Sequence, residues 1–136
     1  MCRKPNILIV DDEEPTLLAM SEYFTDRGFT VDCSRDSGEA EALLMANAYA
    51  AMITDLELAE PGERQGLHLI SLARTRRPDI CIILLTGYEY PQVEAEARRL
   101  GADAFVLKPR PMSELRQTVC DLLTSRPRSC QRSSLK

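Results

Sequence analysis

The stretch ILIVDDEEP, residues 7–15, places four acidic side chains directly after four aliphatic ones. An aliphatic run followed by acidic residues and a proline predicts a buried strand that leads into a helix, because acidic side chains and proline both favour the first helical turn. That preference accounts for residues 13–15. It does not account for Asp11 and Asp12, which crowd two like charges at the end of the predicted strand. The two aspartates therefore need an explanation beyond helix formation.

Length and charge limit the classes of protein to which the chain can belong. With 136 residues, it is long enough for one ordinary domain with a full core and too short for two. Its formal net charge of −4 argues against direct binding to nucleic acid or to an anionic membrane, because both need a basic face. The sequence shows neither a leader peptide nor an apolar run of about 18 residues, so we expect a soluble, cytoplasmic protein.

The five cysteines are odd in number, widely spaced and without a CxxC pair. This distribution predicts reduced thiols rather than a disulfide framework or a zinc site. Two of them, Cys33 and Cys81, fall within predicted strands, and we expect them to be small core residues.

Apolar residues follow two different periods in turn along the chain. Patterns typical of strands occur at residues 7–10, 29–33, 49–54, 80–85 and 104–107. Helical spacing follows each of them, and Asp36 with Glu39 three residues later resembles a capping signal for the helix that extends to about Asn47. Strict alternation of strand and helix predicts an α/β fold, a doubly wound (βα)5 three-layer sandwich on a parallel sheet with right-handed crossovers.

Two further segments refine this architecture. Residues 80–85 are apolar without alternation, as expected for a strand in the middle of the sheet that helices cover on both faces. After residue 124 the sequence is polar, basic and without periodicity. We therefore expect one domain at residues 5–124 and a disordered tail, or the start of a linker, at residues 125–136.

Polar residues with reactive side chains stand at the ends of the predicted strands. In chain order they are Asp11, Asp12, Asp55, Thr86 and Lys108. Ligands of open α/β sheets bind at this edge, and with a strand order of 2-1-3-4-5 the first and third strands are neighbours, so that these groups converge. Clustered carboxylates raise one another's pKa or bind a cation, and hard oxygen ligands suit Mg²⁺ or Mn²⁺.

Such a cluster supports phosphoryl chemistry. An aspartate beside a divalent cation can attack a phosphoryl group in line, while an ammonium group and a hydroxyl stabilise the phosphoryl oxygens. The chain contains neither a P-loop nor a GxGxxG motif. We therefore do not expect the metal to serve a bound nucleotide.

Five short motifs follow one another along the chain: ILIVDDE, MITDLEL, LLTG, GAD and VLKP. Together they resemble the signatures of bacterial two-component response-regulator receiver domains, and the resemblance covers residues 5–124. It implies a flavodoxin-like fold with the strand order 2-1-3-4-5. It also implies a phosphorylation-dependent signalling switch rather than an enzyme, with self-phosphorylation from a donor and autodephosphorylation as its only reactions.

The resemblance implies roles for the acidic residues. Asp55 would accept the phosphoryl group from a sensor histidine kinase or a phosphotransfer protein. Asp12 would bind Mg²⁺ or Mn²⁺ directly and Asp11 through water. The remaining metal ligands would be Asp55 and the backbone carbonyl of Glu57.

Signal output is implied to begin at the phosphoryl group. Thr86 and Lys108 would contact that group, and the Lys108–Pro109 peptide bond would be cis. Thr86 and Phe105 would act as a switch that couples the group to the surface of the fourth helix, fifth strand and fifth helix. A downstream output domain or protein would bind there. The resemblance also allows a phosphorylation-dependent homodimer, to which the sequence assigns no face. The predicted charged residues of the output surface are Glu94, Glu96, Arg98, Arg99, Arg116 and Asp121.

Two other functions are compatible with parts of the pattern. A Mg²⁺-dependent phosphatase with an aspartyl nucleophile, similar to the haloacid dehalogenase phosphatases, would combine the same groups, but its D-x-D motif is Asp11-x-Glu13 here. A receiver-like module could also act by docking alone, without phosphorylation. His68 offers no hydrolytic triad, because no serine or cysteine motif accompanies it, and we expect it to be a surface or boundary residue of a helix.

Overall fold

The computed structural model describes residues 4–55, 65–87, 91–108 and 111–125, in which five strands alternate with five helices. The strands are β1 (Asn6–Val10), β2 (Thr30–Ser34), β3 (Ala51–Asp55), β4 (Cys81–Thr86) and β5 (Ala104–Leu107). The helices are α1 (Glu14–Asp26), α2 (Ser37–Ala46), α3 (Gln65–Arg76), α4 (Pro91–Leu100) and α5 (Met112–Ser125).

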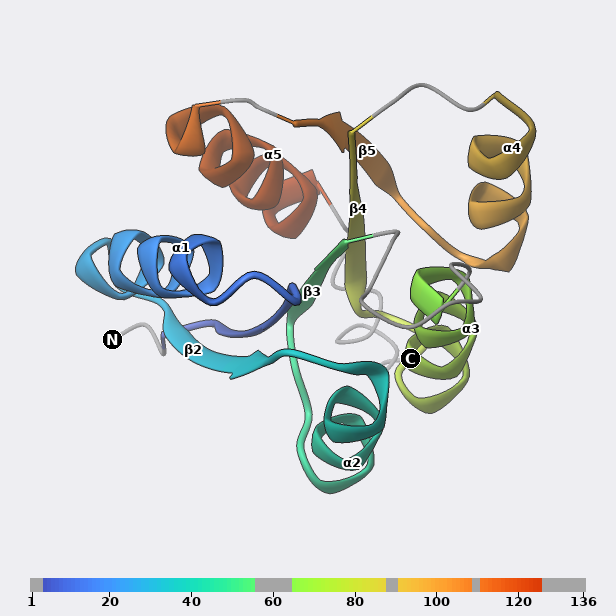
Figure 1. The fold of residues 1–136 in the computed structure, drawn as a ribbon, viewed down its shortest axis with the longest axis horizontal. Coiled ribbons are helices and arrows are strands. Elements are labelled where there is room, and N and C mark those ends of the chain that lie inside the picture. The colour runs from blue at the N-terminus through green and yellow to red at the C-terminus, as the bar shows by residue number, and fades with distance from the viewer. Residues whose placement is uncertain (1–3, 56–64, 88–90, 109–110, 126–136) are drawn as a thin grey trace.

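The sheet is parallel throughout, and its strand order is β2-β1-β3-β4-β5. Helices α1 and α5 cover one face of the sheet, while α2, α3 and α4 cover the other (Figure 1). The predicted doubly wound three-layer sandwich, with its order 2-1-3-4-5, is therefore confirmed.

The prediction for the middle strand is wrong by one position. β3 lies in the middle of the sheet, and β4, which contains the run at residues 80–85, lies between β3 and the edge strand β5. Every residue of both β3 and β4 is buried. Because helices cover both strands on both faces, an apolar run cannot distinguish the middle strand from its neighbour.

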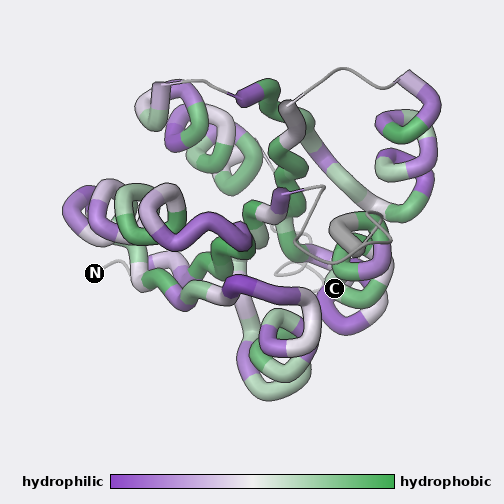
Figure 2. The backbone as a smooth tube through the Cα atoms, viewed as in Figure 1, coloured by the Kyte–Doolittle hydropathy of each residue, from purple (hydrophilic) through white to green (hydrophobic). Residues whose placement is uncertain are grey.

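The core consists of two apolar layers, one on each side of the sheet. Alternate residues of each strand point to opposite faces, so Leu8 packs beneath α2 and α3 whereas Ile7 and Ile9 pack beneath α1 and α5. Figure 2 shows the hydrophobic colour concentrated in the strands and on the inward sides of the helices. This two-sided burial explains why the strands at residues 7–10 and 80–85 are uniformly apolar.

The helix signals in the sequence have identifiable counterparts. Asp36 is the N-cap of α2, and its carboxylate accepts a hydrogen bond of 2.8 Å from the Glu39 N–H, which confirms the predicted cap. Asn47 ends the same helix, as predicted. Gly28 follows α1 with φ of 96°, a backbone conformation that favours glycine.

Three cysteines lie within the described residues, and all three are free thiols. Cys81 is buried in β4, as predicted for a core residue. Cys33 in β2 is only half-buried, and its burial raises the pKa of the thiol above its usual range. A raised pKa keeps this thiol protonated and unreactive at neutral pH.

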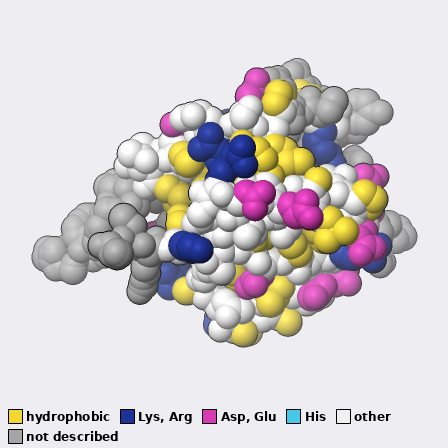
Figure 3. All heavy atoms as spheres, turned by 90° about the vertical axis from the view of Figure 1, so that its left-hand side faces the viewer, with side chains coloured by type: hydrophobic (Ala, Val, Ile, Leu, Met, Phe, Trp, Pro, Cys, Tyr) yellow, Lys and Arg dark blue, Asp and Glu magenta, His cyan; other side chains and the backbone are white. Residues whose placement is uncertain are grey.

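The surface mixes charged and apolar side chains. On the face at the left of Figure 1, Figure 3 shows acidic and basic side chains interspersed, without an extended area of one sign among the residues drawn in colour. Of the large apolar side chains described, Leu18 on α1 and Met45 on α2 are the exposed ones. In the described part of the chain, none of the helices combines the length and the apolar character that crossing a membrane requires.

Candidate functional site

The predicted site residues meet at one edge of the sheet. Asp11 follows β1, Asp55 ends β3, Thr86 ends β4 and Lys108 follows β5, and parallel strands place these ends together. β1 lies beside β3, as the predicted convergence of the aspartates required. Asp11, Asp55 and Thr86 are all buried. For the two aspartates this is unusual, because a buried carboxylate needs a partner.

Three carboxylates form the acidic part of the site. One carboxylate oxygen from each of Asp11, Asp12 and Asp55 lies within 4.8 Å of the others. Asp11 Oδ1 accepts a hydrogen bond of 2.9 Å from the Glu13 N–H, which fixes the orientation of that carboxylate. Its other oxygen, Oδ2, is buried and has no hydrogen-bond partner among the described residues. A buried carboxylate oxygen without a donor is available to bind a cation.

Electrostatics also favour a cation at this position. Burial raises the pKa of Asp11 above its ordinary value, and the charges of Asp55 and Asp12 raise it further. The hydrogen bond from Glu13 and the charge of Lys108 act in the opposite direction and only partly offset the rise. A bound cation would favour the ionised form of all three aspartates.

Lys108 is the positively charged residue of the site, as far as the structure describes it. Its Nζ donates a hydrogen bond of 2.9 Å to Asp55 Oδ2 and lies 3.7 Å from Asp11 Oδ2. Burial lowers the pKa of Lys108, but the hydrogen bond and the charge of Asp55, together with the charges of Asp11 and Glu13, outweigh it and leave the pKa raised. The ammonium group is therefore charged and directed at Asp55.

A comparison with protein-family models decides which family these features represent. The model described as the response regulator receiver domain matches residues 7–120 of the chain. The chain belongs to this family. Receiver domains are regulatory domains rather than classical enzymes, so the family argues against the aspartyl phosphatase considered above.

Named relatives support the assignment. The chain is 34% identical over 110 residues to the photosynthetic apparatus regulatory protein RegA of Cereibacter sphaeroides, a match that covers 81% of this chain and 58% of RegA. It is 26% identical over 134 residues to the alginate biosynthesis transcriptional regulatory protein AlgB of Pseudomonas aeruginosa, covering 98% of this chain and 29% of AlgB. This receiver domain thus spans about half the length of the first relative and less of the second.

Solved structures share the fold. A CheY-like receiver domain protein from Methanospirillum hungatei has a TM-score of 0.85 at 25% identity, and the match covers 91% of this chain and 97% of that one. A response regulator from Burkholderia pseudomallei, solved with a phosphorylated aspartic acid, a calcium ion and citrate, has a TM-score of 0.78 at 25% identity. That match covers 97% of this chain and 74% of the other.

Phe105 of this receiver domain lies beside α4. It is half-buried, packs against the apolar layer beneath α3 and α4, and shares that face of the sheet with Thr86. The guanidinium carbon of Arg98 on α4 lies 4.6 Å from the centre of the Phe105 ring, at cation–π distance. The sequence contained no signal for this contact, because the two residues belong to different elements.

The predicted output surface is only partly as expected. Glu94, Glu96 and Arg98 lie on α4 as predicted. Arg116 on α5 instead donates a hydrogen bond of 3.3 Å from its Nε to the hydroxyl of Tyr23 on α1, so it lies on the side of α5 that faces α1. Helical spacing places a residue on a face but does not tell which neighbour that face meets.

Some of the predicted features lie outside the part of the chain that the structure describes. Glu57 and Pro109 lie outside the described residues, so the carbonyl ligand and the cis peptide bond stay predictions. The tail at 126–136 also lies outside them. His68 is on α3 with an exposed side chain whose Nε2 lies 2.6 Å from Glu41 Oε2, in agreement with the predicted surface position.

Proposed function

We propose that this receiver domain is a phosphorylation-dependent switch in which Asp55 accepts a phosphoryl group with the help of Mg²⁺ or Mn²⁺. The observation that carries the proposal is the cluster of Asp11, Asp12 and Asp55 within 4.8 Å, with a buried Asp11 oxygen that lacks a hydrogen-bond donor in the described residues. Hard oxygen donors of this kind suit either cation.

The chemistry assigns a task to each residue. A carboxylate oxygen of Asp55 forms a bond to phosphorus, the bond from phosphorus to a histidine nitrogen of the donor breaks, and that nitrogen keeps the electron pair. Asp11, Asp12 and the Glu57 carbonyl would hold the cation together with Asp55. When bound, the cation would neutralise negative charge on the phosphoryl oxygens.

Lys108 and Thr86 would complete the site. Lys108 already lies at Asp55, so its ammonium group can follow the new charge when a phosphoryl group is attached. The Thr86 hydroxyl, buried at the end of β4, would donate to a phosphoryl oxygen. Movement of Thr86 and Phe105, which share one face of β4 and β5, would change the surface of α4, β5 and α5.

The proposed partners follow from the same role. The donor would be a sensor histidine kinase or a phosphotransfer protein, in the cytoplasm, and the recipient of the signal an output domain or a separate protein. The names of RegA and AlgB as regulatory proteins support this proposal, and so does the phosphorylated aspartate of the Burkholderia pseudomallei regulator. A phosphorylation-dependent homodimer is part of the same proposal.

Mass spectrometry after treatment with acetyl phosphate and Mg²⁺ tests the assignment. We expect one hydroxylamine-labile phosphate on the wild type and none on Asp55→Asn, because the amide is not a nucleophile for phosphorus. Asp121→Asn, an exposed aspartate on α5, is the matched control and should label fully. Full labelling of Asp55→Asn would show that another residue accepts the phosphoryl group.

A further inference from the structure

The position of Lys108 depends on how the edge strand β5 is aligned with β4. The sequence of β5 by itself determines this alignment poorly. All four residues of β5 are apolar and half-buried. Ala104 and Val106 pack on the side of α1 and α5, whereas Phe105 packs on the side of α4. A shift of one residue along β4 would exchange these faces without moving any polar side chain of the strand into the core. The apolar pattern therefore leaves the register of β5 weakly determined.

Asp103, just before β5, can fix the register of this strand on β4. Its N–H donates a hydrogen bond of 2.8 Å to the Ile82 carbonyl, and its Oδ2 accepts one of 2.8 Å from the Ile82 N–H. Asp103 thus makes both hydrogen bonds that Ile82 of β4 offers to this edge. After a shift of one residue, Ala102 or Ala104 would face Ile82, and neither has a side-chain acceptor.

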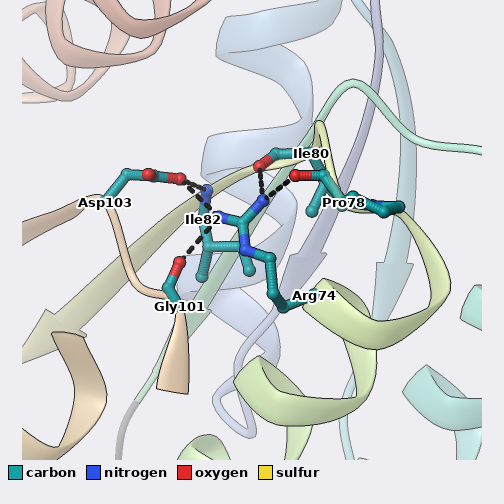
Figure 4. A network of polar contacts seen from close by, with 6 residues as sticks. All are labelled: Arg74, Pro78, Ile80, Ile82, Gly101 and Asp103. Carbon is teal, nitrogen blue, oxygen red and sulfur yellow. Dashed lines mark hydrogen bonds and ion pairs between the residues drawn. The ribbon is translucent and has the colours of Figure 1, made fainter. Parts of the chain in front are cut away.

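Arg74 at the end of α3 holds Asp103 in place (Figure 4). Its Nη2 donates to Asp103 Oδ2 at 2.9 Å and to the Gly101 carbonyl at 2.7 Å. Its Nη1 donates to the carbonyls of Pro78 and Ile80 at 2.6 and 2.8 Å. Arg74 is partly buried, and its guanidinium group joins three segments: the end of α3, the approach to β4 and the turn before β5.

The turn before β5 is shaped around Arg74. Gly101 has φ of 128°, which favours glycine, and a Cβ at this position would lie 2.8 Å from Arg74 Nε and 3.0 Å from its Cβ. A side chain at residue 101 would displace the arginine. The GAD sequence at residues 101–103 thus combines a residue that makes room for Arg74 with one that binds it.

The direction of the Lys108 side chain, at the other end of β5, depends on this register. The Lys108 N–H donates a hydrogen bond of 2.8 Å to the Thr86 carbonyl, in the same ladder that begins at Ile82 and Asp103. The Lys108 side chain then reaches Asp55. Because side chains alternate along a strand, a shift of one residue would direct Lys108 away from the carboxylates.

We propose that Arg74 and Asp103 are positioning residues, which fix the register of β5 on β4. They act at the start of β5 and thereby direct Lys108, at the other end of this strand, toward Asp55. The proposal rests on the proposed function in one respect, namely that Lys108 assists phosphoryl transfer. Among the contacts described, neither residue touches Asp11, Asp55 or Lys108.

Two variants and a conservative replacement test the proposal. Asp103→Leu and Arg74→Met remove the acceptor for Ile82 and the guanidinium group. We expect the Lys108 amide to lose protection from hydrogen exchange and the NMR contacts between Leu84 and Phe105 to weaken. The maximal rate of labelling by acetyl phosphate with Mg²⁺ should fall about tenfold to a hundredfold, as for a displaced catalytic group. Asp103→Asn keeps an oxygen for the Ile82 N–H and should largely restore the amide protection, the NMR contacts and the labelling rate.

Controls separate positioning from general loss of stability. Arg77→Met removes an arginine that follows α3 and pairs with Asp79 at 3.8 Å, without a side-chain bond to β5 among the described contacts. Leu44→Val weakens the core beneath α2, which contacts β1 and β2 at the other end of the sheet. Both should label at the wild-type rate. An equal slowing in Leu44→Val, or an unchanged Lys108 amide and labelling rate in Asp103→Leu, would overturn the proposal.

Lys108→Ala, measured alongside, distinguishes failure of the inference from failure of the proposed function. Slow labelling of this variant is expected. Wild-type labelling of Lys108→Ala would remove Lys108 from the phosphoryl chemistry, and the hydrogen exchange and cross-strand NMR contacts, which need no phosphoryl group, would then decide the claim about register alone.

Discussion

The ammonium group of Lys108 lies 2.9 Å from the carboxylate of Asp55, across the end of the strand that separates β3 from β5. It also lies 3.7 Å from Asp11 Oδ2, so one cation serves two buried carboxylates. Lys108 therefore contacts two of the three carboxylates that would hold a metal ion. The lysine is thus both a counterion of the unphosphorylated site and a competitor of any added cation.

Removal of Lys108 should affect metal binding and labelling in opposite directions. In Lys108→Met, Mg²⁺ should bind about fivefold more tightly, because an ion pair that is partly open to water contributes up to about 1 kcal/mol. Labelling by acetyl phosphate should slow, since no ammonium group then faces the phosphoryl oxygens. Titration calorimetry with Mg²⁺ measures the first effect. Weaker Mg²⁺ binding in the variant would show that the lysine organises the carboxylates rather than competing with the cation.

Asp11 should make the metal-free protein less stable as the pH rises. A carboxyl group whose pKa is higher in the folded state than its model value of 3.8 stabilises the fold at low pH. That contribution is lost as the pH rises from 3.8 through the folded pKa. Asp11→Asn keeps the acceptor for the Glu13 N–H and should raise the free energy of unfolding at pH 7 by about 1 to 3 kcal/mol.

Urea denaturation with a chelator, at several pH values between 3 and 8, tests this expectation. The wild type should lose stability relative to Asp11→Asn across the acidic part of that range. Added Mg²⁺ should stabilise the wild type more than the variant, which keeps Asp12 and Asp55 as ligands but loses one carboxylate charge. Parallel stability curves for the two proteins would mean that Asp11 does not carry the raised pKa.

Phosphorylation of Asp55 should change the environment of Phe105 as well as that of the residues next to Asp55. Beryllium fluoride with Mg²⁺ should shift the NMR signals of Thr86, Phe105 and α4, because a Thr86 hydroxyl drawn to the phosphoryl mimic leaves space into which the ring can turn. Arg98→Ala should favour movement of the ring by about 0.5 to 1 kcal/mol even without the mimic, since the cation–π contact stabilises the position that the ring has in this structure. Shifts confined to the neighbours of Asp55 would contradict this coupling.

Tyr49 should contribute to stability without affecting phosphorylation. Its buried hydroxyl donates a hydrogen bond of 2.6 Å to Asp32 on β2, and burial together with that carboxylate raises the pKa of the tyrosine. Tyr49→Phe should lower the free energy of unfolding by about 1.5 to 3 kcal/mol, the range for a hydrogen bond to a charged group. Denaturation at pH 7 measures the loss, and an unchanged labelling rate is the control for the site.

The local signals in the sequence determined the elements and their order. Aliphatic runs, helical spacing, the Asp36 cap and the glycines after α1 and α4 depend on a few neighbouring residues, so strands and helices were predictable within a few residues of their bounds. The residues that stand at strand ends were also predictable. Together with the strand order that the family resemblance implied, they located the site formed by Asp11, Asp55 and Lys108.

Tertiary structure alone decided which side chains meet. Strand ends predicted that Lys108 and Asp55, 53 residues apart, lie in one site, but not that they form a direct hydrogen bond. Arg74 and Asp103 are 29 residues apart, and no pattern in the sequence predicted this pair. The same limit explains why β4 was expected in the middle of the sheet and why Arg116 faces α1. Periodicity reports whether a residue is buried and on which face of its own element, whereas the identity of its neighbour depends on the packing of elements far apart in the chain.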